Sequence, residues 1–143
     1  MQIIYKLLMM KELGIYNKEN QRIFTVIKPG FLHLAKNIIE IFNKNGWEVS
    51  KLRTKQLLRK EANKLYAVHK KESFYNDLCK YMSSGPSLAI IFTRDKLNND
   101  KIYKEVSEIK DKIRKKWGES EMRNVLHSSD SYEHMLKEMS IYF

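Results

Sequence analysis

The sequence has only one cysteine and no apolar run long enough to cross a membrane. A single thiol, Cys79, cannot form an internal disulfide, so we expect a reducing compartment and a cytoplasmic protein. The apolar stretch from Met1 to Tyr16 is interrupted by two lysines and a glutamate, and it lacks a small-residue cleavage site. Residues 1–21 are therefore predicted to be an N-terminal extension rather than a signal peptide.

Internal repeats, low-complexity segments and linkers are also missing, so a single domain over residues 22–143 is predicted. Acidic residues are the minority: 17 of them against 27 basic residues give a net charge of +10. This surplus suits polyanions, either nucleotides or nucleic acid, although the lysines are spread along the chain rather than clustered. A metal site is not expected, because the spacing of His33, His69, His127 and His134 matches no compact ligand motif.

What the sequence does contain is a histidine in a polar setting, His127, within the stretch Asn124-Val125-Leu126-His127-Ser128-Ser129-Asp130-Ser131. A neutral imidazole is a good nucleophile toward phosphorus, and the N–H groups at a helix N-terminus attract anions. Asp130, followed three residues later by Glu133, predicts a capping box that places the histidine directly before a helix. Lys28, in Ile27-Lys28-Pro29-Gly30, is a cation available far upstream.

Hydrophobic periodicity predicts alternating strands and helices. The predicted strands are 22–28, 47–52, 88–92 and 122–126, and the predicted helices are 33–45, 56–69, 72–82, 100–117 and 131–139. Trp47, Val49 and Leu52 suggest a second strand with period two, and Leu57 and Leu58 are expected on the inner side of the following helix. An α+β sandwich, with an antiparallel sheet covered by helices on one side, fits four strands better than a doubly wound fold.

Several separated segments, in this order, resemble the nucleoside diphosphate kinases. They are Thr25-Val26-Ile27-Lys28-Pro29-Gly30; Leu65-Tyr66; Ser73-Phe74-Tyr75-Asn76-Asp77-Leu78; Lys80-Tyr81-Met82-Ser83-Ser84-Gly85-Pro86; the histidine stretch; and Glu138-Met139-Ser140-Ile141-Tyr142-Phe143. The resemblance covers about residues 22–143. It implies a ferredoxin-like α+β fold with a four-stranded antiparallel sheet covered by helices.

The resemblance also implies a reaction, in which a γ-phosphoryl group passes from a nucleoside triphosphate to a nucleoside diphosphate through a phosphohistidine. His127 matches the nucleophile, and Glu138 and Ser129 match the residues that orient its ring. Lys28 matches the lysine that contacts the transferred phosphoryl group and the sugar. Mg²⁺ is the implied cofactor, held by the nucleotide phosphates and not by a protein cage.

Five further residues match nucleotide-binding positions: Tyr66 and Arg114 near the phosphates, Phe74 and Leu78 at the base, and Asn124 at the 3′-hydroxyl. Arg114 aligns without gaps to the histidine stretch, and a guanidinium there clamps phosphates. Taken alone, the aromatic and aliphatic residues of this set are more typical of a core than of a binding site. The arginine alone is one more basic residue on a basic helix.

Three departures mark a divergent member. No acidic residue stands between Pro29 and Gly30, and Ser128 replaces the glycine after the histidine. The long loop between the third strand and the catalytic histidine is shortened, with the helical run 103–116 in its place. Nothing matches that loop's phosphate-contacting threonine, and Lys104 is only a weak match for the arginine before it. Because the loop packs at the trimer axis of family hexamers, we expect a homo-oligomer with altered assembly, either a dimer or a rebuilt hexamer.

Two other functions are compatible with the residues. A catalytically weak nucleotide-binding or protein-interaction module of the same fold, suggested by the missing loop, would bind nucleotide without phosphorylation of His127. A nucleic-acid-binding protein would show an affinity that falls steeply with salt and does not depend on His127. Nucleic acid is not the favoured partner, and no membrane association is expected.

Overall fold

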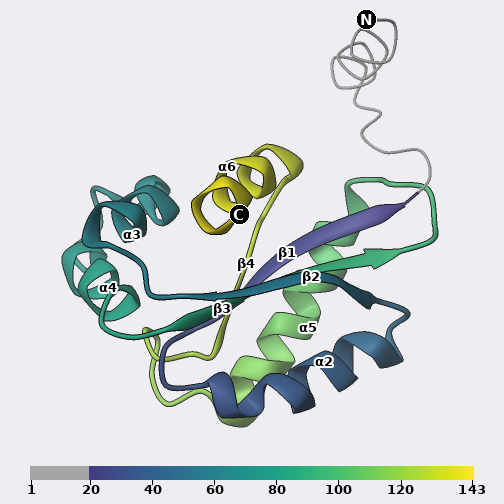
Figure 1. Cartoon of the computed structure of the whole chain (residues 1–143), viewed down its shortest axis with the longest axis horizontal. Coiled ribbons are helices and arrows are strands. Elements are labelled where there is room, and N and C mark those ends of the chain that lie inside the picture. Colours follow the sequence, from purple (N-terminus) through teal and green to yellow (C-terminus); the bar gives the residue numbers. More distant parts are fainter. Residues whose placement is uncertain (1–19) are drawn as a thin grey trace, which may run out of the picture.

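The computed structural model describes residues 20–143 (Figure 1). The strands are β1 (Gln21–Ile27), β2 (Glu48–Lys55), β3 (Ser87–Arg94) and β4 (Leu126–Ser128). The helices are α2 (Ala35–Lys44), α3 (Arg59–Leu65), α4 (Tyr75–Met82), α5 (Lys101–Trp117) and α6 (Tyr132–Tyr142), with short 3₁₀ turns η1 (Leu32–Leu34) and η2 (Ala67–His69). Apart from its last two residues, of which Gln21 begins β1, the predicted extension lies outside the described residues.

Within residues 20–143, four strands form an antiparallel sheet in the order β2-β3-β1-β4. The buried strands β1 and β3 occupy the centre, with Phe24 opposite Ile91 and Val26 opposite Ala89. The short β4 pairs with the end of β1, and β2 forms the other edge. The predicted α+β fold with a four-stranded antiparallel sheet is confirmed.

Residues 20–143 contain no helix that is both long and apolar enough to span a bilayer.

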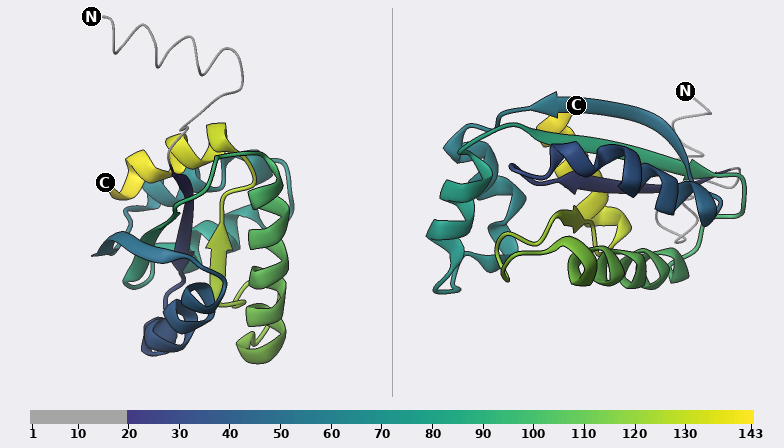
Figure 2. Two further views of the ribbon diagram at one scale, coloured as in Figure 1. Left: turned by 90° about the vertical axis from the view of Figure 1, so that its right-hand side faces the viewer. Right: turned by 90° about the horizontal axis from the view of Figure 1, so that it is seen from below.

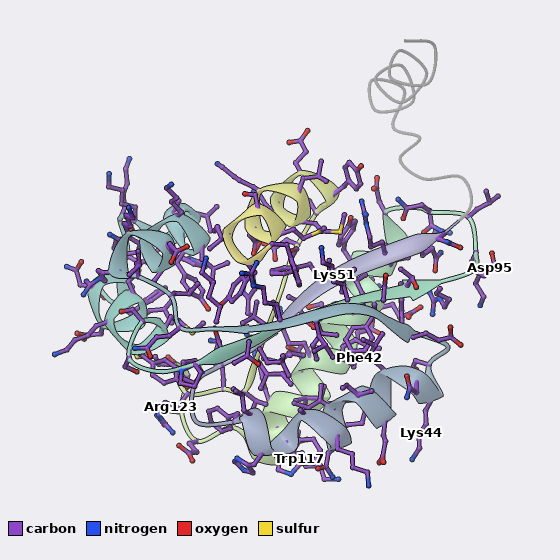
Figure 3. All side chains as sticks on the ribbon, in the orientation of Figure 1. Phe42, Lys44, Lys51, Asp95, Trp117 and Arg123 are labelled. Carbon is purple, nitrogen blue, oxygen red and sulfur yellow. The ribbon has the colours of Figure 1, made fainter. Side chains whose placement is uncertain are left out.

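Helices cover both faces of the sheet, so the expectation of a one-sided cover was wrong (Figure 1). Successive side chains of a strand point to opposite faces. Ile23 and Ile27 therefore pack with α2 and α5, whereas Phe24 and Val26 pack with α3, α4 and α6. Figure 3 shows Phe42 between the sheet and α2, where its ring stacks on that of β3 Phe92 at 4.4 Å. Apolar periodicity could not predict which face of the sheet each helix covers, because both faces of the central strands are apolar.

The expectation that Leu58 points inward was also wrong. On the edge strand β2, Val49 and Leu52 are 37% and 53% exposed. The predicted helix over 56–69 is instead α3 followed by η2, and Leu58 precedes it with an extended backbone and a 59% exposed side chain. Its N–H is capped by the carboxylate of Glu61 at 2.9 Å, which fixes the later helix start.

A polar cluster fixes the first half of α5 to the end of the sheet. The Arg94 guanidinium donates two hydrogen bonds to the Glu105 carboxylate, at 2.8 and 3.0 Å, and a third to Gln21 at 2.7 Å. It lies over the Trp47 ring at 4.1 Å, and the indole N–H donates to the same carboxylate at 2.9 Å. Trp47 is fully buried just before β2, as its apolar character predicts.

Candidate active site

A cavity of about 570 Å³ opens beside β4, between the end of β1, α5, α6 and the segment that joins α3 to α4. Its size suits a small ligand. Eight of the nine residues predicted for the site line it: Lys28, Tyr66, Phe74, Leu78, Arg114, Asn124, His127 and Glu138. The ninth, Ser129, is buried at 5% exposure and is not among the lining residues.

His127 lies in the middle of β4, not directly before a helix as expected. It pairs with Val26 of β1 and shares that residue's face of the sheet, which brings it toward α6. Its Nε2 forms a hydrogen bond with the carboxylate of Glu138 on α6. The other ring nitrogen, Nδ1, has no hydrogen-bond partner within residues 20–143 and is the nitrogen left for chemistry in the cavity.

The start of α6 also differs from the expectation. Ser131, not Asp130, is the N-cap, and its hydroxyl accepts a hydrogen bond from the His134 N–H at 3.2 Å. The N3 position is then a histidine, so the predicted capping box with Glu133 does not form. The strand predicted over 122–126 is correspondingly shifted to β4. The helix therefore starts five residues after His127, and the imidazole is positioned by a strand and a neighbouring carboxylate.

Glu138 and Ser129 differ in their relation to the histidine. The Glu138 side chain is only 10% exposed and touches the ring nitrogen directly. The Ser129 hydroxyl is buried without a hydrogen-bond partner in the described chain, so this structure does not bring it onto the ring or the carboxylate. Only its backbone is engaged, through an N–H bond to the Phe24 carbonyl at 3.3 Å.

Lys28 follows β1 and is almost fully buried, at 3% exposure. Its ammonium donates to the Met122 carbonyl at 3.3 Å and lies 5.9 Å from the centre of the Tyr66 ring. Burial, followed by repulsion from Arg114 and Lys110, lowers the pKa of Lys28 from 10.5 to about 7. An anion bound beside this amine would restore its proton.

The turn after Lys28 is held by contacts that explain its glycine. The Tyr81 hydroxyl donates to the Pro29 carbonyl, and the Arg123 guanidinium covers the Tyr81 ring at 5.2 Å. Gly30 has φ +91°, and a Cβ there would lie 2.9 Å from the guanidinium (Arg123 is labelled in Figure 3). The positive φ would strain a residue with a side chain, whereas the close contact is with the end of a flexible side chain and can be relieved by its movement.

Aromatic rings form a row along the cavity. The Tyr66 ring lies edge-on to His127 at 5.6 Å and 6.4 Å from the His69 ring, which in turn lies 5.5 Å from Phe74. Phe74 is 42% exposed, an unusual state for a core residue and a suitable one for a stacking surface, whereas Leu78 beside it is buried. The buried Tyr66 hydroxyl has no hydrogen-bond partner in residues 20–143, and burial raises its pKa well above 10.

Arg114 and Asn124 connect the cavity to the backbone. The Arg114 Nε and Nη2 atoms donate to the Leu126 carbonyl at 3.1 and 2.8 Å, which ties α5 to β4. Asn124 donates to the Glu121 carbonyl at 2.7 Å, and its buried Oδ1 has no partner in the described chain. Val125, between Asn124 and Leu126 in the chain, has φ 77°, a strained backbone for a β-branched residue.

Sequence reasoning missed two lining residues of chemical interest, His69 and Lys110. Lys110 stands one helical turn before Arg114, and this i,i+4 spacing could have indicated it. No comparable signal marks His69, which reaches the cavity because η2 follows α3. Lys104 is exposed and does not line the cavity.

In comparisons with known proteins, the chain is similar to members of one family. The family model described as "Nucleoside diphosphate kinase" matches residues 21–143. The chain is 33% identical to a protein named "Nucleoside diphosphate kinase" from Lawsonia intracellularis, with 86% of this chain and 94% of that protein covered. It is 34% identical to one of the same name from Saccharolobus solfataricus, again with 86% and 94% covered.

Two further similarities concern length and structure. The chain is 33% identical to "Nucleoside diphosphate kinase homolog 7" of Rattus norvegicus, and spans about a third of that relative's length (33%) and of its mouse counterpart's. The crystal structure of the Aquifex aeolicus nucleoside diphosphate kinase superposes with a TM-score of 0.72 at 26% identity. That alignment covers 87% of this chain and 95% of the other.

Proposed function

The chain belongs to the nucleoside diphosphate kinase family, and we propose that it is an active phosphotransferase with a phosphohistidine intermediate. The γ-phosphoryl group of a nucleoside triphosphate would pass to His127 and then to a second nucleoside diphosphate, in two in-line displacements. One observation carries this proposal: an imidazole held by a buried carboxylate, with its second nitrogen open to a cavity that also exposes cations.

The Glu138 carboxylate indicates which nitrogen would react. With Glu138 accepting a hydrogen bond from Nε2–H, the lone pair stands on Nδ1, and this is the tautomer needed for attack on phosphorus at that nitrogen. In the first step the bond between the γ-phosphorus and its bridging oxygen breaks, and its electron pair leaves with the diphosphate. A P–N bond forms at Nδ1, and the same carboxylate stabilises the positive charge that develops on the ring.

The nucleotide would lie along the cavity with its phosphates toward β4. The Lys28 ammonium lies 5.9 Å from the centre of the Tyr66 ring, which lies 5.6 Å from the His127 ring. From this position Lys28 would follow the transferred phosphoryl group to the histidine. Phe74 offers an exposed ring face to the base with Leu78 beneath it, and a ring face accepts every nucleobase. The unpartnered polar atoms of Tyr66 and Asn124 are available to the phosphates and the sugar.

We propose that Mg²⁺ enters the site bound to the nucleotide phosphates. The carboxylates that line the cavity, Glu121, Asp130 and Glu138, come from separate segments, and Glu138 already binds the histidine. Residues 20–143 contain no group of three or more acidic, histidine or cysteine side chains that could hold a metal ion. When bound, Mg²⁺ would neutralise phosphate charge, and the protein's own cations would supply the rest.

We also propose that two copies associate through β2. This strand forms an edge of the sheet, and Val49 and Leu52 present apolar surface there. An unpaired edge of eight residues is a template for another strand, which favours a homo-oligomer with a dimer as its unit. A cytoplasmic location, where a free thiol such as Cys79 persists and nucleoside triphosphates occur, fits this activity.

The test is intact-mass analysis of the protein after brief incubation with MgATP. We expect one acid-labile phosphoryl group on the wild type, none on His127→Ala, and its discharge when GDP is added. His33→Ala, which removes an exposed histidine outside the cavity, is the matched control and should be phosphorylated normally. Nucleotide binding without any phosphoryl group would contradict the enzyme and favour the catalytically weak nucleotide-binding module.

A further inference from the structure

Helix α5 turns a second cation toward the cavity. Its buried stripe of Ile109 and Ile113 packs on the sheet, and Lys110 and Arg114 each follow one of these residues. They are therefore rotated about 100° from the stripe and stand one turn apart on the same flank. Figure 2 shows α5 running alongside β4, and both side chains line the same cavity as His127.

Within residues 20–143, none of the three cations of the cavity, Lys28, Lys110 and Arg114, forms an ion pair with a carboxylate. Arg114 is bound to the Leu126 carbonyl and Lys28 to the Met122 carbonyl, both neutral acceptors. Lys110 forms no hydrogen bond or ion pair with any residue from 20 to 143, although it is half-buried. Burial and repulsion from Arg114 lower its pKa, although the carboxylates of Asp130, Asp111 and Glu138 act in the opposite direction. Like charges held together in a partly desolvated cavity are unfavourable until an anion of high charge joins them.

We infer that Lys110 is a catalytic residue that binds the terminal phosphates of the nucleoside triphosphate. The inference rests on the proposed function and specifies it further. As the bond between the γ-phosphorus and the bridging oxygen breaks, negative charge accumulates on the departing diphosphate. An ammonium on α5, on the same side as Arg114, stabilises that charge, while Lys28 follows the phosphoryl group to His127. In this chain a continuous helix thus supplies a phosphate contact from its own flank.

Binding measurements separate a phosphate ligand from a merely structural lysine. The probes are an ATP analogue with a methylene bridge between its β- and γ-phosphates, which cannot transfer the group, and AMP, which lacks the terminal phosphates. Lys110→Ala should weaken binding of the analogue about 10- to 100-fold and leave AMP binding unchanged, as expected for a lost charge-assisted contact. Lys110→Arg should recover most of the affinity, and Lys110→Gln should resemble alanine.

Lys112→Ala, on the exposed side of the same helix, is the matched control and should change neither affinity. Unchanged binding of the analogue, or equal weakening of the analogue and AMP, would overturn the inference. If the wild type takes up no phosphoryl group from MgATP, the proposed function fails. The comparison of analogue with AMP still decides the role of Lys110 in that case.

Discussion

Lys28 shows how a buried cation in the cavity lowers the stability of the fold. It is 3% exposed beside Arg114 and Lys110, and its pKa is about 7 in the folded protein, against 10.5 ordinarily. Below pH 7 it is charged in both the folded and the unfolded state, and above 10.5 it is neutral in both. Between these values the unfolded chain binds more protons, so the free energy of unfolding contributed by this group rises with pH.

This linkage predicts a pH-dependent difference between the wild type and Lys28→Met. Methionine removes the buried charge, so the variant should be the more stable protein at pH 7. Its advantage should shrink by roughly 2 kcal/mol by pH 9, since one pH unit of linkage is worth about 1.4 kcal/mol. Urea unfolding at both pH values measures it, with Lys112→Met as an exposed control. A constant difference would mean that Lys28 keeps its proton.

Some residues of the site were recognisable from sequence motifs, and others only from their position in the tertiary structure. His127, Lys28 and Glu138 belong to sequence segments with a known pattern, and the fold brings them to one cavity. The Ser129 hydroxyl was expected beside the ring, but the strand pairing of β4 leaves it buried on its own. Lys110 was one of several lysines in the sequence, marked only by its i,i+4 spacing to Arg114, and the rotation of α5 brings it to the cavity.

At the level of elements, α5 is held at two points. Arg114 ties its second half to β4, and the Arg94–Glu105 pair with Trp47 ties its first half to the far end of the sheet. These ties fix the position of the α5 flank that carries Lys110 and Arg114. Val106 and its apolar neighbours supply the burial between them.

Loss of the Arg94–Glu105 tie should destabilise the fold without changing the cavity. Glu105→Ala leaves the Arg94 guanidinium and the Trp47 N–H short of their acceptor, and should reduce the free energy of unfolding by about 1–2 kcal/mol, because water partly replaces a half-exposed carboxylate. Denaturant unfolding measures this. Glu108→Ala, exposed on the same helix, should change it by less than about 0.5 kcal/mol. Equal effects of the two substitutions would contradict the role given to the cluster.

Element order and type were predictable, whereas boundaries near the site were not. The strand expected over 122–126 became β4 because Val125 adopts a positive φ, which redirects the chain immediately before the histidine. No sequence rule assigns that conformation to a valine. Buried hydrogen bonds enforce it, among them the one from the Lys28 N–H to the Val125 carbonyl at 2.8 Å.

For the whole molecule, the exposed edge at β2 bears on assembly. One face of this strand is occupied within the chain: Lys51 lies over the Phe143 ring, and Arg53 and Lys55 donate to carbonyls at the end of α6. Leu52 remains 53% exposed, and the outer edge has no pairing strand within residues 20–143. A second copy of the chain would satisfy both.

Light scattering after size-exclusion chromatography tests this assembly. We expect the wild type to have the mass of a dimer or of a larger assembly built from dimers. Leu52→Lys should yield monomers at micromolar concentration, because an unpaired ammonium in an apolar contact is strongly unfavourable. Leu97→Lys, which adds the same charge at another exposed leucine in the loop after β3, should keep the wild-type mass. A monomeric wild type, or an unchanged mass for Leu52→Lys, would contradict an interface on β2.

The sequence by itself determined the order of strands and helices, the family and the chemical identities at the site, because these depend on local periodicity and on short motifs. The tertiary structure alone decided which helices cover which face of the sheet, since both faces of β1 and β3 are apolar and pattern does not distinguish them. It also decided the open Nδ1 of His127 and the approach of Lys110 to Lys28. Strand pairing and helix rotation set those contacts between residues far apart in the chain.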